Sequence, residues 1–284
     1  MHEHVVVTGS FDDLRSRHVR FLHEASRFGP VTVLMWPDEL LVRQFGGTPK
    51  FPEHERVYLV RALRYVKHVI VLPANLAAGA GQAFWSEIVS FAKRVGLGQV
   101  RLVVPQPEDT ADKAGAARAQ GVGYTVIPEH DLAGFPEVPA EPREDGPPRK
   151  KVIVTGCFDW LHSGHVRFFE EVSALGDLYV AVGNDANVRM LKGPGHPLHT
   201  QEERRYMVAS VRYVKQALIT TGSGWLDAEP EILRLKPDIY AVNEDGDRGG
   251  KREFCRAHGI EYVVLKREPA PGLPRRTSTE LRGF

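Results

Sequence analysis

The stretch Val152-Ile-Val-Thr-Gly-Cys-Phe-Asp159 repeats, with two changes, an earlier stretch near the N-terminus, Val5-Val-Val-Thr-Gly-Ser-Phe-Asp12. Three further matches follow in the same order along the chain: His18-Val-Arg-Phe21 with His165-Val-Arg-Phe168, Arg64-Tyr-Val-Lys67 with Arg212-Tyr-Val-Lys215, and Arg118-Ala-Gln-Gly121 with Arg256-Ala-His-Gly259. Four ordered matches indicate an internal duplication, and their slightly different spacings indicate insertions and deletions in loops.

The segment between the two copies has the composition of a linker. Residues 137–150 contain four prolines and charges of both signs, with almost no apolar side chain. We therefore expect a first domain over 1–136, a linker over 137–150 and a second domain over 151–284, each near the usual domain size.

Each copy alternates short apolar runs with amphipathic segments. In the second copy, residues 152–154 are expected to form a buried strand, and residues 178–182, 238–242 and 262–265 further strands. Between them, Phe168, Val172 and Leu175 recur at helical spacing. Strands that alternate with helices predict parallel β-α-β units. The expected fold class is α/β, with two tandem Rossmann-like domains, each a doubly wound parallel sheet that binds ligands beyond the carboxyl ends of its strands.

Composition excludes several other classes of protein. The 284 residues carry 37 Lys and Arg against 36 Asp and Glu, a net charge of +1, which argues against a nucleic-acid partner. Two cysteines, Cys157 and Cys255, are too few for a disulfide framework or a cysteine-built metal site. No run approaches the roughly 18 apolar residues of a membrane span, and no basic region leads into a cleavable signal. We expect a cytoplasmic protein.

One motif at a strand-to-helix crossover has the features of an anion site. Thr155-Gly-Cys-Phe-Asp-Trp-Leu-His-Ser-Gly-His165 follows the predicted strand and opens the predicted helix. Gly164 leaves room for a ligand near the backbone, and Ser163 suits a helix N-cap. His162 and His165 stand beside a helix N-terminus, whose unpaired N–H groups favour an anion. An isolated pair of this kind is more often a surface feature, so its place in the fold is what favours a function.

The motif resembles the signature of the HxGH nucleotidyltransferase superfamily, which includes the cytidylyltransferases for glycerol phosphate and phosphoethanolamine and the heptose phosphate adenylyltransferases. Three later segments are similar to those of the family. Val188-Arg-Met-Leu-Lys-Gly-Pro194 resembles the lysine-bearing phosphate loop, and Glu203-Arg204 with Val211-Arg-Tyr-Val214 resembles the helix on the nucleotide side. Arg276-Thr-Ser-Thr-Glu-Leu-Arg282 resembles the closing signature.

The resemblance implies nucleotidyl transfer, in which a phosphate monoester attacks the α-phosphorus of a nucleoside triphosphate and pyrophosphate leaves. Mg²⁺ would be held by the phosphates, without a metal ligand from the protein side chains. The implied catalytic residues are His162, His165, Lys192 and Arg276. The implied nucleotide-binding residues are Gly156, Cys157, Phe158, Gly164, Arg204, Thr277, Ser278 and Thr279. Asp159, Asn243 and Asp245 are candidates for contacts with the acceptor.

The resemblance leaves the base and the acceptor open. Arg212-Tyr-Val214, Trp225 and the tandem layout favour CTP, whereas Leu191-Lys-Gly-Pro194 and the segment 234–238 look more like the ATP-using heptose enzymes. A phosphorylated polyol, sugar or amino alcohol fits as the acceptor. Two other classes stay open. One is a nucleotide-binding regulatory or scaffold protein without turnover. The other is a metal-dependent hydrolase, which is disfavoured because no third metal ligand accompanies His162 and His165 at a suitable spacing.

The first copy lacks most of these residues. Arg15 stands where the second copy has His162, Arg17 where it has Gly164, and Gly46 where it has Lys192, so that His18 alone remains of the motif. We predict a degenerate, inactive first domain and one active site in each chain. That domain would serve as an intramolecular partner, in a pseudo-dimer or within a homodimer; a regulatory phosphate or nucleotide site in it is the alternative.

Overall fold

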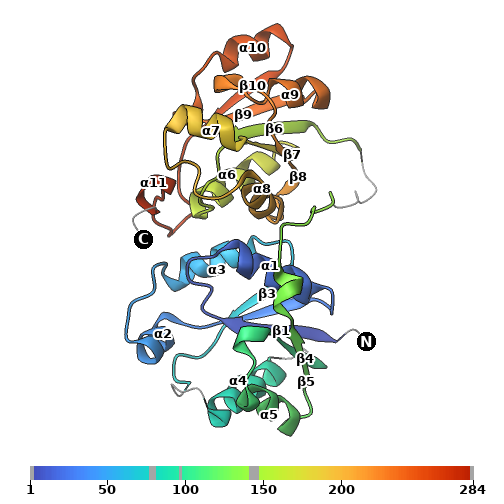
Figure 1. Cartoon of the computed structure of the whole chain (residues 1–284), viewed down its shortest axis with the longest axis vertical. Helices are drawn as coiled ribbons and strands as arrows, with labels where there is room; N and C mark the ends of the chain where they lie inside the picture. Colours follow the sequence, from blue (N-terminus) through green and yellow to red (C-terminus); the bar gives the residue numbers. More distant parts are fainter. Residues whose placement is uncertain (1–2, 77–80, 96–97, 141–146, 282–284) are drawn as a thin grey trace. The chain divides into compact units, whose positions relative to one another are not determined.

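The computed structural model describes residues 3–76, 81–95, 98–140 and 147–281. The chain forms two compact units, Met1–Gly134 and Phe135–Phe284 (Figure 1). Residues 141–146 of the predicted linker lie outside the described residues.

The first unit is built around a five-stranded sheet in the order β3-β2-β1-β4-β5, and each paired strand runs parallel to its neighbour. Its strands are β1 (His4–Gly9), β2 (Val31–Met35), β3 (Val66–Val71), β4 (Val100–Pro105) and β5 (Gly123–Ile127). Its helices are α1 (Ser16–Ser26), α2 (Asp38–Phe45), α3 (Glu53–Arg61), α4 (Gln82–Arg94) and α5 (Ala111–Ala119), with 3₁₀ turns η1 (Gln106–Glu108) and η2 (Glu129–Leu132). In Figure 1, α1 and α3 lie on one side of these strands and α4 and α5 on the other.

The second unit repeats this topology with the sheet order β10-β9-β6-β7-β8, again parallel at each pairing. Its strands are β6 (Lys151–Gly156), β7 (Asp177–Val182), β8 (Val214–Ile219), β9 (Ile239–Asn243) and β10 (Glu261–Leu265). Its helices are α6 (Ser163–Ser173), α7 (Asp185–Lys192), α8 (Gln201–Ala209), α9 (Glu229–Leu235), α10 (Lys251–Ala257) and α11 (Ser278–Leu281), with 3₁₀ turns η3 (Gly224–Leu226) and η4 (Glu244–Gly246). The predicted class, two tandem Rossmann-like α/β domains, is confirmed.

The first strand of each unit lies at the centre of its sheet. Val152, Ile153 and Val154 of β6 are completely buried, as expected for a parallel strand covered on both faces. Strand order reverses at this strand, since β7 lies on one side of it and β9 on the other. The crevice beyond its carboxyl end is therefore the expected ligand site.

The helix that follows β6 is shorter than predicted. Phe168 and Val172 are buried in α6, but α6 ends at Ser173 and Leu175 is 38% exposed. Leu175, which shares the predicted helical spacing, lies beyond the end of the helix, because the chain turns at Ala174 towards Gly176 and strand β7. At Gly176 a side chain would collide with the carbonyl oxygen of Lys150.

A buried arginine ties together the loops at the carboxyl edge of each sheet. In the second unit Arg204 is 1% exposed and donates to the carbonyl oxygens of Cys157, Gly183 and His199 and to the carboxylate of Asp185. In the first unit, Arg56 is fully buried and bonds in the same way to the carbonyl oxygens of Ser10, Trp36 and Phe51 and to the carboxylate of Asp38.

We call the buried arginine and the loops that it holds the loop clamp. An aspartate adds further hydrogen bonds to the loop clamp in both units. Asp159 accepts backbone N–H bonds from Leu198 at 2.8 Å and from His199 at 3.0 Å. Asp12 likewise accepts from the backbone N–H groups of Lys50 and Phe51. The same loop scaffold therefore stands beneath the carboxyl edge of both sheets.

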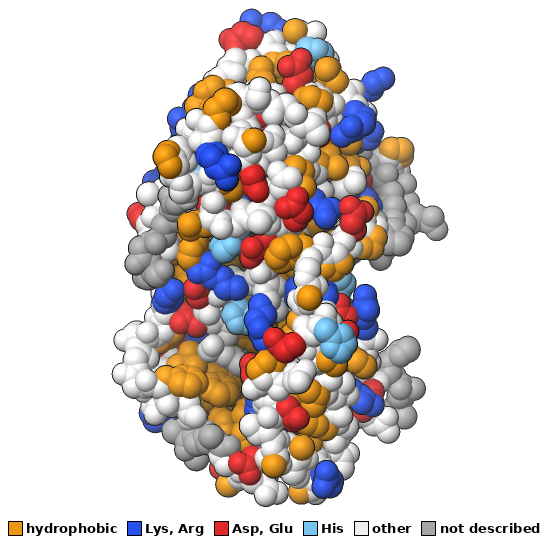
Figure 2. Space-filling model, in the orientation of Figure 1, with side chains coloured by type: hydrophobic (Ala, Val, Ile, Leu, Met, Phe, Trp, Pro, Cys, Tyr) orange, Lys and Arg blue, Asp and Glu red, His pale blue; other side chains and the backbone are white. Residues whose placement is uncertain are grey.

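Charged side chains of both signs are interspersed on the described part of the face shown in Figure 2. An extended basic surface, the usual footprint of a nucleic-acid-binding protein, is not seen on that part of the face. Among the described residues, no helix is long and apolar enough to cross a bilayer.

Candidate active site

A cavity of about 200 Å³ opens at the carboxyl end of β6, where the strand order reverses. Its walls come from the ends of β6 and β9, the start of α6, the end of α7, the loop after β10 and the start of α11. The lining residues are Thr155, Gly156, Cys157, Phe158, His162, Gly164, His165, Phe168, Lys192, Val242, Asn243, Asp245, Gly246, Lys251, Arg267 and Ser278.

Two stacked imidazoles form the wall of this cavity next to α6. The ring centroids of His162 and His165 lie 3.8 Å apart, with the ring planes inclined by 22°. His162 is the N-cap of α6, and its Nδ1 accepts the backbone N–H of Gly164 at 3.1 Å. Because Nδ1 accepts, the proton of the neutral ring sits on Nε2. Within the described residues, the buried atoms Nε2 of His162 and Nδ1 of His165 have no hydrogen-bond partner.

The surroundings keep both rings neutral. Burial, and then the guanidinium groups of Arg267 and Arg276, lowers the pKa of His162 to about 3. Burial, together with His162, Arg267 and Lys192, holds the pKa of His165 well below its ordinary value. At pH 7 both rings are therefore neutral, and His162 offers the N–H of its Nε2 to a ligand. A buried polar atom without a partner is costly, so a ligand that accepts from it is favoured.

Three cationic side chains surround the cavity. Lys192 enters from the last turn of α7, Lys251 from the first turn of α10, and Arg267 from the loop directly after β10. Arg267 forms an ion pair with Asp245 and donates to the carbonyl oxygen of Arg276 at 3.2 Å. With one carboxylate among the lining side chains, the cavity is electropositive and suits a polyanion.

Most of the predicted site residues meet in this cavity. Gly156, Cys157, Phe158, His162, Gly164, His165, Lys192, Asn243, Asp245 and Ser278 all line it. Glycine suits position 164, because a Cβ there would lie in tight contact with the ring of His162, at 3.0 Å, and 3.6 Å from the carbonyl oxygen of Arg276. Burial raises the pKa of the Cys157 thiol, so this cysteine contributes an uncharged wall.

Other predicted residues lie elsewhere. Arg204 and Asp159 belong to the clamp beneath the cavity, where backbone groups and Asp185 use their hydrogen-bonding atoms. Thr277 caps α11 by exchanging hydrogen bonds with Glu280, and Thr279 is exposed. The expected direct contacts of Arg204 with the nucleotide and of Asp159 with the acceptor stay predictions.

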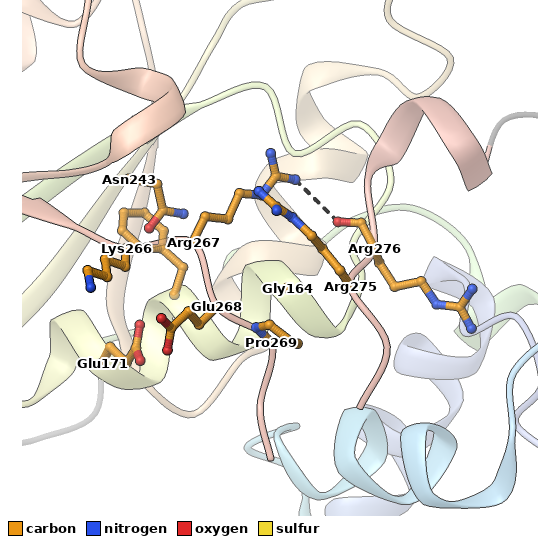
Figure 3. A pocket seen from close by; sticks show the side chains of 10 residues that line it. Gly164, Glu171, Asn243, Lys266, Arg267, Glu268, Pro269, Arg275 and Arg276 are labelled. Atoms are coloured by element: carbon orange, nitrogen blue, oxygen red, sulfur yellow. Dashed lines mark hydrogen bonds between the residues drawn. The ribbon is translucent and has the colours of Figure 1, made fainter. Parts of the chain in front are cut away.

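Arg276 lines a second, smaller groove that continues from the cavity past Gly164, Asn243 and Arg267. Figure 3 shows the side chains of Arg267 and Arg275 pointing towards each other, whereas that of Arg276 points away from them. The dashed line marks the bond from Arg267 to the backbone of Arg276.

Sequence reasoning missed Arg267 and Lys251 as site residues. Both follow the carboxyl end of a predicted strand, β10 and β9 respectively, which is the edge where parallel sheets bind ligands. Arg267 could have been predicted from the sequence, because it is a basic residue just after the end of a predicted strand. Lys251 stands eight positions after Asn243, and its place at the cavity depends on the path of the intervening turn.

The first unit has a cavity at the equivalent place, with different chemistry. It measures about 150 Å³ and is lined by Thr8, Gly9, Ser10, Phe11, Arg17, His18, Phe21, Pro105, Pro107, Glu108 and Leu132. Arg17, its one lining Lys or Arg among the described residues, is paired with Glu129 at 2.5 Å. Since Glu108 adds a negative charge, this cavity does not carry the positive charge of its counterpart.

The first unit also fills space that the second leaves open. The backbone N–H of Trp36 bonds the carbonyl oxygen of Gly9, just as that of Gly183 bonds Gly156. Trp36 and Gly183 thus occupy equivalent positions. The first unit has an indole side chain where the second unit has a glycine without a side chain. The indole N–H of Trp36 donates to the hydroxyl of Thr8 at 2.8 Å, which fixes the ring at the carboxyl edge.

Comparison with known proteins matches residues 153–283 to the family model "Cytidylyltransferase-like". The bifunctional protein HldE of Azotobacter vinelandii is 38% identical over 121 residues, which are 41% of this chain and 24% of that protein. The FAD synthase of Ferroglobus placidus is 38% identical over 120 residues, 41% of this chain and 75% of that protein. The HldE of Geobacter sulfurreducens is 32% identical over 201 residues, 69% of this chain and 39% of that protein. The chain thus spans 24% of the length of the first of these curated relatives.

Proposed function

Because the chain belongs to the cytidylyltransferase-like family of nucleotidyltransferases, we propose that its second unit transfers a nucleoside monophosphate from a nucleoside triphosphate to a phosphorylated small molecule. The observation that carries this proposal is the stacked pair of neutral imidazoles, His162 and His165, whose buried nitrogens line an electropositive cavity.

The reaction needs little from the protein beyond positioning and charge stabilisation. An oxygen of the acceptor phosphate attacks the α-phosphorus, and the bond from that phosphorus to the oxygen bridging to the β-phosphorus breaks. Pyrophosphate leaves with the electron pair. The attacking phosphate is already ionised at pH 7, so no general base is required. The imidazole N–H donors, Lys192 and Arg267 stabilise the negative charge that builds on the phosphate oxygens.

We propose that Mg²⁺ enters with the triphosphate rather than in a protein cage. Asp245 is the one carboxylate that lines the cavity, and it is already paired with Arg267. Among the described residues, no group of three His, Cys, Asp or Glu side chains is placed to hold a metal ion. The donor set fits an ion ligated by phosphate oxygens, which neutralises part of their charge.

We propose CTP as the nucleotide, with ATP as the second candidate. The segment 212–214 and the tandem layout support CTP. Trp225 adds no support, because its side chain is 51% exposed, is covered in part by Arg248 and does not line the cavity. The similarity to an FAD synthase, named for a product that contains adenine, favours ATP. The acceptor class is a phosphorylated polyol, sugar or amino alcohol.

We propose one active site in each chain. In the first unit the charge of the cavity is balanced, the counterpart of His162 is Arg15, and Trp36 fills the edge of the sheet. This unit keeps the fold and the loop clamp without the cations that a triphosphate requires.

The test is pyrophosphate release with Mg²⁺, each of the four nucleoside triphosphates, and a panel of phosphorylated polyols, sugars and amino alcohols. We expect turnover with one triphosphate and its loss in His165→Ala. Nucleotide binding by calorimetry, without turnover across the panel, would support a regulatory protein instead. Absence of both nucleotide binding and turnover would refute the proposed function.

A further inference from the structure

Lys251 is a buried cation in the wall of the cavity. Its side chain is 8% exposed, and it lies beside Asn243, Asp245 and Gly246. The ammonium donates to the carbonyl oxygen of Gly246 at 3.0 Å and lies 5.9 Å from the centre of the Tyr240 ring. Among the described residues, no carboxylate oxygen comes within 4.0 Å of this ammonium. A buried ammonium with three donors and no carboxylate in contact is costly.

The first unit has a lysine at the equivalent position, and a carboxylate of the same unit neutralises its charge. Lys113 in α5 is the counterpart of Lys251 in the repeat, because the two lysines have the same separation along the chain as Arg118 and Arg256. Lys113 is 6% exposed. Its ammonium pairs with the carboxylate of Glu108 at 3.4 Å and lies 4.5 Å from the centre of the Trp85 ring. Both lysines therefore occupy a buried position at the start of the helix that precedes the last strand.

One position separates the two arrangements. The counterpart of Glu108 at the same spacing is Gly246, which offers Lys251 a carbonyl oxygen in place of a carboxylate. The loss of that side chain exposes the ammonium of Lys251 to the cavity, whereas Glu108 neutralises Lys113. The unit with the phosphate-binding residues is thus the one whose lysine lacks an internal counter-ion.

We propose that Lys251 binds substrate, and that its counter-charge is an anionic phosphate oxygen of the nucleoside triphosphate or of the acceptor. This inference rests on the proposed function and adds a residue, outside the motifs, to the same site. Arg267, another cation in the lining, already has Asp245 as its partner.

The electrostatic surroundings agree with a ligand as the missing partner. Burial lowers the pKa of Lys251, an effect that the carboxylates of Asp227, Asp247 and Asp245 offset in part. Arg248 opposes them. An anion bound at the ammonium would restore the stability of its charged form.

Two substitutions remove the charge of Lys251 from the cavity in different ways. Lys251→Met deletes it, and Gly246→Glu supplies the internal counter-ion that the first unit has. A side chain fits at position 246, because a Cβ there would lie 3.9 Å from the Cβ of Val242, the nearest atom. The backbone of Gly246 is also outside the left-handed region, so it accepts a residue with a side chain. Gly246→Gln is the matched uncharged control, and Lys113→Met is the matched control in the first unit.

The measurements are calorimetric binding of each Mg²⁺–nucleoside triphosphate without acceptor, and the KM values for both substrates. We expect Lys251→Met and Gly246→Glu to weaken binding of the substrate that supplies the phosphate by about tenfold or more, as for loss of a charge-assisted hydrogen bond. We expect Lys251→Arg to retain most of the binding. The Kd of Gly246→Gln should be lower than that of Gly246→Glu by about threefold or more. The Kd of Lys113→Met should stay within about twofold of the wild-type value.

The two arms identify the source of the phosphate. Weaker triphosphate binding without acceptor assigns the contact to the triphosphate, and a raised KM for the acceptor alone assigns it to the acceptor. Wild-type binding and KM values in folded Lys251→Met and Gly246→Glu would overturn the inference while leaving nucleotidyl transfer intact. A wild-type chain that neither binds nor turns over a nucleotide would refute the proposed function as well. Thermal unfolding checks that each variant is folded, and Gly246→Glu serves if Lys251→Met does not fold.

Discussion

The ring of His162 stacks on that of His165 at 3.8 Å, and the Nδ1 atom of His162 is already committed to the backbone of Gly164. The helix start thus fixes the tautomer of the first ring, and the first ring fixes the plane of the second. A pair oriented in this way needs no reorganisation when a phosphate arrives, which is the condition for strong electrostatic stabilisation.

Replacing His165 with Ala is expected to lower kcat for pyrophosphate release by about 10²- to 10³-fold, the usual effect of removing one transition-state donor. Pyrophosphate release at saturating substrates measures it. A variant that keeps more than a tenth of the wild-type kcat would contradict the assigned role.

The matching substitution in the first unit, Arg15→Ala with His18→Ala, is expected to leave kcat and KM within about twofold of wild type, because both residues belong to the unit without the proposed active site. The same assay measures both. If the double variant lost activity while it remained folded, the first unit would have to take part in the reaction.

Acid is expected to destabilise the second unit through its histidines. The folded-state pKa of His162 is about 3, below the ordinary value near 6.5, so the unfolded state binds the proton more readily between those pH values. Stability is therefore complete above pH 6.5 and falls as the pH drops towards 3, with a slope of up to about 1.4 kcal/mol per pH unit for each such histidine.

Urea unfolding at pH 7, 5.5 and 4.5 measures this dependence. His162→Gln is the control, since it cannot titrate, and its free energy of unfolding should fall less steeply over the same range. Parallel curves for the variant and the wild type would show that the buried imidazole does not carry the effect.

Arg204→Met is expected to destabilise the second unit by about 3 kcal/mol, because it removes a buried guanidinium and leaves three carbonyl oxygens and the half-buried carboxylate of Asp185 without their donor. Arg56→Met should do the same to the first unit. Thermal unfolding followed by calorimetry measures both. A normal melting temperature together with weakened nucleotide binding would instead return Arg204 to the role first predicted for it.

The sequence predicted the topology and the centre of the site well, for physical reasons that can be named. Apolar strands alternating with helices determine a parallel sheet, and the topology determines where its loops meet. His162 and His165 were therefore placed correctly. For Arg204 and Asp159 the sequence did not predict the hydrogen bonds to the loops, because a motif shows which residues recur and does not distinguish a ligand contact from a bond that holds a loop. Their counterparts Arg56 and Asp12, present in a copy that lacks the phosphate residues, were the available signal for a structural role.

Residues that reach the site from turns were harder to predict. Lys251 lines the cavity because η4 and two glycines in the left-handed conformation, Gly249 and Gly250, return the chain to the sheet edge. Such a path depends on tertiary contacts, including the close approach of Gly249 to Trp225. No periodicity in the sequence encodes it.

The central position of β1 and β6 has a consequence for how the chain folds. Each of these strands must pair with a strand far along the chain, β1 with β4 from His4 to Val100 and β6 with β9 from Val152 to Ile239. Pairings over such separations form slowly, since long loops must close first. The two strands have almost the same sequence, so each can pair with the neighbours of the other, and a molecule refolding from denaturant can exchange them. Synthesis on the ribosome reduces this hazard, because residues 1–134 emerge and can close their own sheet before β6 exists to compete.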